Sequence, residues 1–85
     1  MFEFDDIKSE LNKKKHGIDF EESQSLWEDE SRIIIPAKKL DEPRYLLIAK
    51  IGDKRWSAIF TIRRKRIRII SVRRSRFNER SIYES

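Results

Sequence analysis

Arginine dominates the part of the chain best suited to chemistry. Residues 63–80 contain nine basic residues and one acid, Glu79, so this segment carries a charge of 9 − 1 = +8. The planar guanidinium of arginine grips a phosphate through two parallel hydrogen bonds. Isoleucines and a valine alternate with the arginines, as in a folded strand and unlike a disordered basic tail. The segment therefore predicts a folded surface for an anionic partner, and nucleic acid is the natural candidate.

The arginines occupy three kinds of position in the elements that this segment predicts. Arg63 lies where a strand gives way to a turn, Arg68 lies within the next strand, and others lie at the junction with a last helix. A helix N-terminus also favours an anion, so this junction is the predicted phosphate site. The candidates for catalysis are Arg63, Arg68, Arg73 and Arg76, and those for substrate binding are Arg66, Arg74, Arg80 and Tyr83. The alternative for each arginine is an exposed cation paired with an acid of the two predicted N-terminal helices.

Candidate groups for proton transfer are few. Cleavage of a phosphodiester by proton transfer would need a base, an acid for the leaving oxygen and cations around the phosphate. Glu42 lies in a link before a strand and could reach a substrate, whereas Glu79 is expected to pair with its arginine neighbours. His16, the only histidine, belongs to the residue type that ordinarily titrates near neutrality. Its position before Gly17 is more typical of a helix end that packs on the domain than of a catalytic histidine.

The composition excludes several other chemistries. The chain has no cysteine, so disulfides, zinc–thiolate sites and thiol catalysis are excluded, and no metal-site spacing occurs. No apolar stretch approaches the roughly 20 residues that cross a bilayer. The acidic opening around Asp5 is unlike a signal peptide. We therefore expect a cytoplasmic protein that uses no metal and no cofactor and has no membrane partner.

The patterning predicts one α+β domain over residues 1–85. A first helix is expected to run from Asp5 or Asp6 to about residue 15 and to end at Gly17. A second helix is expected over about residues 19–27, because Asp19 and Glu22 have the spacing of a capping box.

The remainder of the chain predicts an antiparallel sheet and a last helix. Four strands are expected, at residues 33–35, 44–51, 55–62 and 66–73. A polar connection over residues 36–43 precedes the hairpins, and Ser75 is expected to cap the C-terminal helix. The predicted architecture is two N-terminal helices, a four-stranded antiparallel sheet and a C-terminal helix.

Six segments, in order and with compatible spacing, resemble the BrnT family of bacterial type II toxins. They are residues 2–5 (FEFD), 12–22 (NKKKHGIDFEE), 44–45 (RY), 61–63 (TIR), 66–74 (RIRIISVRR) and 79–84 (ERSIYE). The resemblance spans nearly the whole chain. Two departures are Ile62, where many members have Glu, and Ser75, where many have Ala.

The resemblance implies a metal-independent endoribonuclease toxin with a RelE-like fold. It also implies an RNA substrate and a BrnA-like antitoxin, through which the complex binds operator DNA and represses its own operon. The antitoxin would inhibit by covering the basic face. The alternative that the residues leave open is a non-catalytic module, which would bind nucleic acid or a protein partner through the same arginines.

Overall fold

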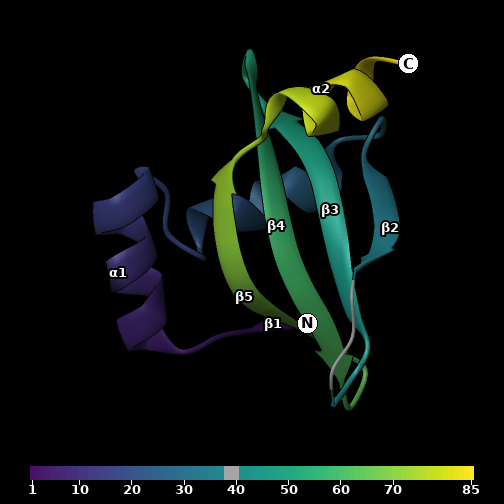
Figure 1. Cartoon of the computed structure of the whole chain (residues 1–85). Coiled ribbons are helices and arrows are strands. Elements are labelled where there is room, and N and C mark those ends of the chain that lie inside the picture. Colours follow the sequence, from purple (N-terminus) through teal and green to yellow (C-terminus); the bar gives the residue numbers. More distant parts are fainter. Residues whose placement is uncertain (38–40) are drawn as a thin grey trace.

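A five-stranded sheet forms the centre of the molecule in the computed structural model, which describes residues 1–37 and 41–85 (Figure 1). The strands are β1 (Phe2–Glu3), β2 (Ile33–Ala37), β3 (Arg44–Ile51), β4 (Lys54–Arg63) and β5 (Arg66–Arg74). Their spatial order is β1-β5-β4-β3-β2. Strand β1 runs parallel to β5, and the other neighbours are antiparallel. The two hairpins β3–β4 and β4–β5 thus supply the three central strands.

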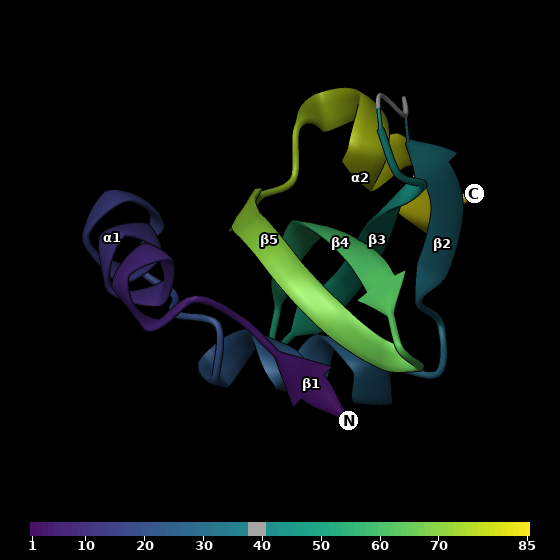
Figure 2. The ribbon, with the colours of Figure 1, turned by 90° about the horizontal axis from the view of Figure 1, so that it is seen from below.

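Three helical segments surround the sheet: α1 (Asp6–His16), the 3₁₀ helix η1 (Glu22–Glu28) and α2 (Phe77–Glu84). Helix α1 lies beyond the free part of the β5 edge, η1 crosses one face and α2 lies on the other face (Figure 2). Asp5 caps α1 by accepting a hydrogen bond from Lys8 N at 3.0 Å. Gly17 ends it in the left-handed region at φ 84°, where glycine has no Cβ penalty. No helix of the described residues is long and apolar enough to span a membrane.

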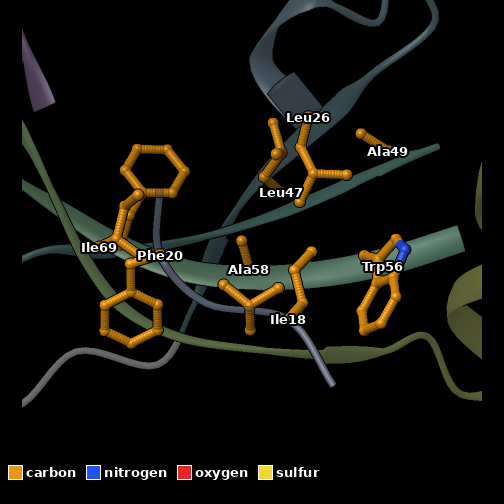
Figure 3. Close-up of a cluster of buried hydrophobic side chains, with 10 residues drawn as sticks. Ile18, Phe20, Leu26, Leu47, Ala49, Trp56, Ala58 and Ile69 are labelled. Atoms are coloured by element: carbon orange, nitrogen blue, oxygen red, sulfur yellow. The ribbon is translucent and has the colours of Figure 1, made fainter. Parts of the chain in front are cut away.

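The hydrophobic core fills the space between the sheet and η1. Alternate residues of the central strands point into it, and Leu26 of η1 closes it from the opposite side (Figure 3). Ile18 and Phe20, in the link between α1 and η1, complete the packing. The sheet side contributes Leu47, Ala49, Trp56, Ala58, Phe60, Ile69 and Val72.

The side chain of Asn12 fastens α1 to the edge of β5. Its Nδ2 donates to Val72 O at 2.9 Å and to Ile18 O at 2.8 Å, and its Oδ1 accepts from Val72 N at 3.2 Å. The buried amide therefore pairs with β5 as a further strand would, at an edge that β1 covers only opposite Ile67 and Arg68.

The predicted four-stranded, wholly antiparallel sheet is wrong, because β1 adds a fifth and parallel strand. Two residues carry no detectable strand pattern, and their partner is 65 residues away in β5. Ile67 N donates to Met1 O at 2.8 Å, which extends this short pairing. The α+β class and the predicted hairpins are confirmed.

The second predicted helix forms, but as a 3₁₀ helix and not as an α-helix. The predicted capping pair is present, since Glu22 N donates to Asp19 Oδ1 at 2.7 Å and Asp19 N to Glu22 Oε1 at 2.9 Å. Ser23 and Ser25 then donate their hydroxyls to carbonyls three residues earlier, at 3.0 and 3.1 Å. Such local bonds compete with regular helix and help to explain the tighter winding.

Two smaller predictions also need correction at the ends of elements. Strand β2 continues through Pro36 to Ala37, while residues 38–40 of the predicted connection lie outside the described residues. The N-cap of α2 is Arg76, whose N–H donates to Glu79 at 2.8 Å. Ser75 instead lies buried with its hydroxyl 2.8 Å from that of Ser57.

Candidate functional site

Four arginines lie on the face of the sheet that also carries α2, at the end remote from that helix: Arg44, Arg63, Arg66 and Arg68. We call this surface the arginine face. Arg63 is paired with Arg66, and Arg68 with Thr61, in the β4–β5 register. Alternation assigns their side chains to one side, because neighbouring Phe60 points into the core on the other. Three different strands thus bring these cations together.

A polar pocket opens at one end of the arginine face. Its volume is about 280 Å³, and Asp41, Glu42, Arg44 and Arg63 line it. Glu42 accepts from Arg63 Nη2 at 3.1 and 3.3 Å and from Arg63 Nε at 3.4 Å. Both side chains are substantially exposed, and exposed ion pairs are worth at most about 1 kcal/mol. A phosphate can therefore displace this carboxylate from the guanidinium.

Thr61 holds the segment that carries Glu42 against the sheet. Its Oγ1 donates to Pro43 O at 2.6 Å, and the residue is 1% exposed. Pro43 follows Glu42 directly, so this bond fixes the backbone next to the residue that carries the carboxylate. The position of the pocket therefore depends on a buried hydroxyl of β4.

The other two members of the arginine face differ in their surroundings. Arg68 Nη1 lies 3.3 Å from Glu3 Oε2, because the parallel pairing of β1 places Glu3 beside it. Arg66 is exposed, and within the described residues no carboxylate pairs with it. The face thus combines two guanidinium groups that carry carboxylates, those of Arg63 and Arg68, with two that form no ion pair among the described residues, those of Arg44 and Arg66.

At the opposite end of the sheet, Arg73 is fully engaged by Glu79 of α2. Two bonds of 2.8 Å join the guanidinium to the carboxylate, and Glu79 is 6% exposed. These bonds, with others from Arg76 N and Ser57 Oγ, outweigh burial and hold the pKa of Glu79 down at about 2. The same hydrogen bonds raise the pKa of Arg73. This pair fastens α2 to the sheet.

The remaining arginine candidates surround α2 and not the pocket. Arg74 lies over the ring of Trp56, 5.5 Å from its centroid, and Arg80 donates to Ser75 O at 2.9 Å. The Arg76 side chain is exposed at the start of the helix. The structure therefore divides the predicted arginines between two ends of the sheet. Those at the helix junction make more contacts with other groups of the fold.

Tyr83 binds a carboxylate of the fold through its hydroxyl. The hydroxyl donates to Asp29 Oδ2 at 2.6 Å, and this bond raises the pKa of Tyr83. Burial works against the ionised form of Asp29, but bonds from Tyr83 and from the N–H groups of Ser31 and Lys50 leave its pKa lowered. Tyr83 thus ties α2 to the chain that follows η1.

His16 is the last residue of α1, as its sequence position predicted. It lies half-buried in a groove of about 230 Å³ beside Ile70 and Ser71 of β5. The structure does not bring it to the pocket with Glu42. Within residues 1–37 and 41–85, no three His, Cys, Asp or Glu side chains gather so that they could hold a metal ion.

Arg44 and Thr61 were not predicted as members of the site. Both could have been found by pairing the two hairpins, since the β3–β4 register sets Tyr45 opposite Phe60 and so puts Arg44 next to Thr61. The density of basic residues in the sequence directed the prediction to residues 63–80 and not to β3, which carries Arg44.

A family model described as the ribonuclease toxin BrnT of type II toxin–antitoxin systems matches residues 4–79. The matched range includes the four arginines of the arginine face and Glu42. No curated protein shows a significant match to the chain.

Proposed function

Since the chain belongs to the BrnT family of ribonuclease toxins of type II toxin–antitoxin systems, we propose that it is a metal-independent endoribonuclease whose active site is the arginine face. The observation that carries this proposal is the pocket that Arg44, Arg63 and Glu42 line, in which Arg63 and Glu42 form an ion pair. Cations that can bind a phosphate and a carboxylate that can accept a proton lie there within one small volume. The fold of the active state is RelE-like in this proposal.

Binding begins when an RNA phosphate takes the place of Glu42 in the fork of Arg63. Arg44, Arg66 and Arg68 hold the neighbouring phosphates along the strand. Released from its ion pair, Glu42 stands beside the ribose and acts as the general base. The guanidinium groups keep their protons throughout, since arginine stays charged in proteins. Their contribution is electrostatic stabilisation of the phosphorane-like transition state.

The bond changes follow from these roles. Glu42 takes the proton of the 2′-hydroxyl, and the 2′-oxygen forms a bond to the adjacent phosphorus. The bond from phosphorus to the 5′-oxygen breaks, and that oxygen takes a proton from water. The products are a 2′,3′-cyclic phosphate and a free 5′-hydroxyl, while the proton on Glu42 returns to solvent.

The other predicted site residues have more distant roles in this proposal. Arg73 positions α2 through Glu79, while Arg76, Arg74, Arg80 and Tyr83 stay predictions for an extended RNA path. The protein partner in this proposal is a BrnA-like antitoxin in the cytoplasm. Operator DNA is bound only through the antitoxin in the toxin–antitoxin complex.

Incubation with labelled RNA in EDTA tests the proposal. We expect cleavage by the wild type and a loss of about 100-fold or more in rate for Arg63→Ala, because one stabilising donor is typically worth that much. Glu42→Gln should lose a similar factor, and RNA with 2′-deoxy substitutions should resist cleavage. Lys14→Ala, an exposed change on α1, is the matched control and should cleave normally.

Two outcomes would contradict the proposal. Intact RNA in every tube, with salt-sensitive binding that Arg63→Ala weakens, would identify a non-catalytic binding module. Cleavage that appears only after a divalent metal is added would refute metal independence.

A further inference from the structure

An apolar groove of about 290 Å³ opens on the face of the sheet opposite the arginine face. Ile34 of β2, Ile62 of β4 and Ile67 of β5 form its walls, and Trp27, Tyr45 and Phe60 also line it. Ile34 is 45% exposed and Ile62 is 54% exposed. Since Phe60 and Ile62 point to the same side of β4, the groove continues the hydrophobic core out to the surface.

The groove differs from scattered apolar exposure, which is ordinary on proteins. Its isoleucines flank aromatic rings in one concavity, and such contiguous apolar surface marks a site of protein contact. The remaining large exposed hydrophobics on α1 and α2, such as Ile7 and Ile82, line no part of it.

The chemistry of the groove suits a protein segment better than RNA. RNA bases stack on open aromatic faces, but Tyr45 stacks on Phe60 at 5.3 Å and Trp27 meets Phe60 edge-on at 5.3 Å. Aliphatic isoleucine offers neither stacking nor a partner for phosphate. An added β-strand is also disfavoured, because Pro36 in the edge strand β2 has no N–H to donate.

One cation completes the groove. Arg32 lies in its wall, exposed, with Nη1 donating to Asp29 O at 3.2 Å. Among the described residues no carboxylate pairs with it. An apolar groove with one available guanidinium on its wall is complementary to an apolar segment that carries an acid.

We propose that this groove docks the protein antitoxin, through a segment that sets aliphatic or aromatic side chains between Ile34 and Ile62 and a carboxylate on Arg32. This inference rests on the proposed function, which supplies the partner. The groove is an anchor separate from the active site, because Ile62 and Arg63 are sequence neighbours on opposite faces of β4. A segment anchored there reaches the arginine face by rounding the turn at Arg64 and Lys65.

Binding and cleavage are measured separately to test the anchor. The probe is the purified product of the reading frame adjacent to the gene of this chain. We expect Ile62→Glu and Ile34→Glu to weaken its binding about tenfold or more by calorimetry, and Arg32→Glu to do likewise. Ile7→Glu changes an isoleucine of α1 that is more exposed, at 70%, and lies outside the groove, so this variant should bind as the wild type does.

The same four variants are assayed for RNA cleavage and for thermal unfolding. We expect wild-type cleavage and folding in all, which distinguishes a lost anchor from a lost active site. Failure of the wild type to cleave RNA would refute the proposed function and leave the binding result to be judged alone.

Several results would overturn the anchor itself. These are unchanged binding by Ile62→Glu and Ile34→Glu, equal weakening by Ile7→Glu, or no binding of the probe to the wild type. Loss of RNA binding in the groove variants would assign the groove to RNA. A dimer of the chain alone that Ile62→Glu dissociates would assign it to a second copy.

Discussion

The carboxylate of Glu79 shows how much one side chain can organise in a small domain. It accepts hydrogen bonds from Arg73, from the backbone of Arg76 and from Ser57, and so joins β5, α2 and β4. A buried carboxylate is costly unless it is paired in this way. Its pKa of about 2 records how strongly the fold favours the ionised form.

Acid should therefore destabilise the protein through Glu79. The ordinary value is 4.5 and the folded value about 2, so the unfolded chain takes up the proton first as pH falls. The contribution is complete above about pH 5 and is lost as the pH falls toward 2. At about 1.4 kcal/mol per pKa unit, it amounts to about 3 kcal/mol. Urea unfolding between about pH 7 and about pH 2.5 measures it.

Glu79→Gln provides the comparison for that measurement. We expect the variant to be about 3 kcal/mol less stable at neutral pH, and this difference should shrink as the pH is lowered. Glu10→Gln, on an exposed position of α1, is the control and should follow the wild type. A difference between wild type and Glu79→Gln that stays constant with pH would show that the charge of Glu79 is not responsible.

At the scale of single residues, the arginines could be predicted from the sequence more readily than the carboxylates that pair with them. The arginine-rich segment was visible in the sequence, but the carboxylates that meet it were not. Glu3 lies 65 residues from Arg68 and Glu42 lies 21 residues from Arg63, and only strand pairing brings them together. The sequence predicted that Glu79 pairs with neighbouring arginines on its helix, yet its bidentate partner is Arg73 on the strand.

At the scale of elements, α1 is fixed to the sheet by a polar contact, since its exposed Ile7 and Leu11 contribute little to the core. Asn12 supplies that contact through three backbone groups of Val72 and Ile18. Replacing it leaves buried donors and acceptors without partners, which is expensive inside a protein.

Asn12→Ala should accordingly destabilise the protein by about 2–4 kcal/mol. Hydrogen exchange of the Val72 amide should accelerate more than that of amides between β3 and β4, because the lost bond is at the β5 edge. Lys14→Ala on the same helix serves as control. Equal acceleration in every strand would mean that α1 and the sheet unfold as one unit and would contradict the local role.

Hairpins and the caps of the first two helical segments were the predictable elements, because their signals are local, whereas the predicted Ser75 cap of α2 was wrong. The strands around Gly52, the stop at Gly17 and the Asp19–Glu22 capping pair all follow from neighbouring residues. Strand β1 and the register shift at Ile59 and Phe60 depend on distant or three-dimensional context. The shift matters for the site, because it sets which residues of β5 stand beside Thr61 and Arg63.

At the scale of the whole molecule, the sheet separates two kinds of surface. One face carries Arg44, Arg63, Arg66 and Arg68, and the other carries the apolar groove beside η1. The lysines of α1 lie elsewhere, beyond the β5 edge (Figure 2). RNA binding should therefore depend on a small part of the total basic charge.

The salt dependence of RNA binding tests this division. With uncleavable 2′-O-methyl RNA, four phosphate contacts predict that the logarithm of the affinity falls with the logarithm of salt at a slope of about −3, at about 0.7 per contact for single strands. Arg66→Ala should reduce the slope by about 0.7, because it removes one contact and no ion pair among the described residues. Lys14→Ala removes the same charge outside the arginine face and should leave the slope unchanged. If both variants flatten it equally, RNA binds to the net charge of the domain and not to the arginine face.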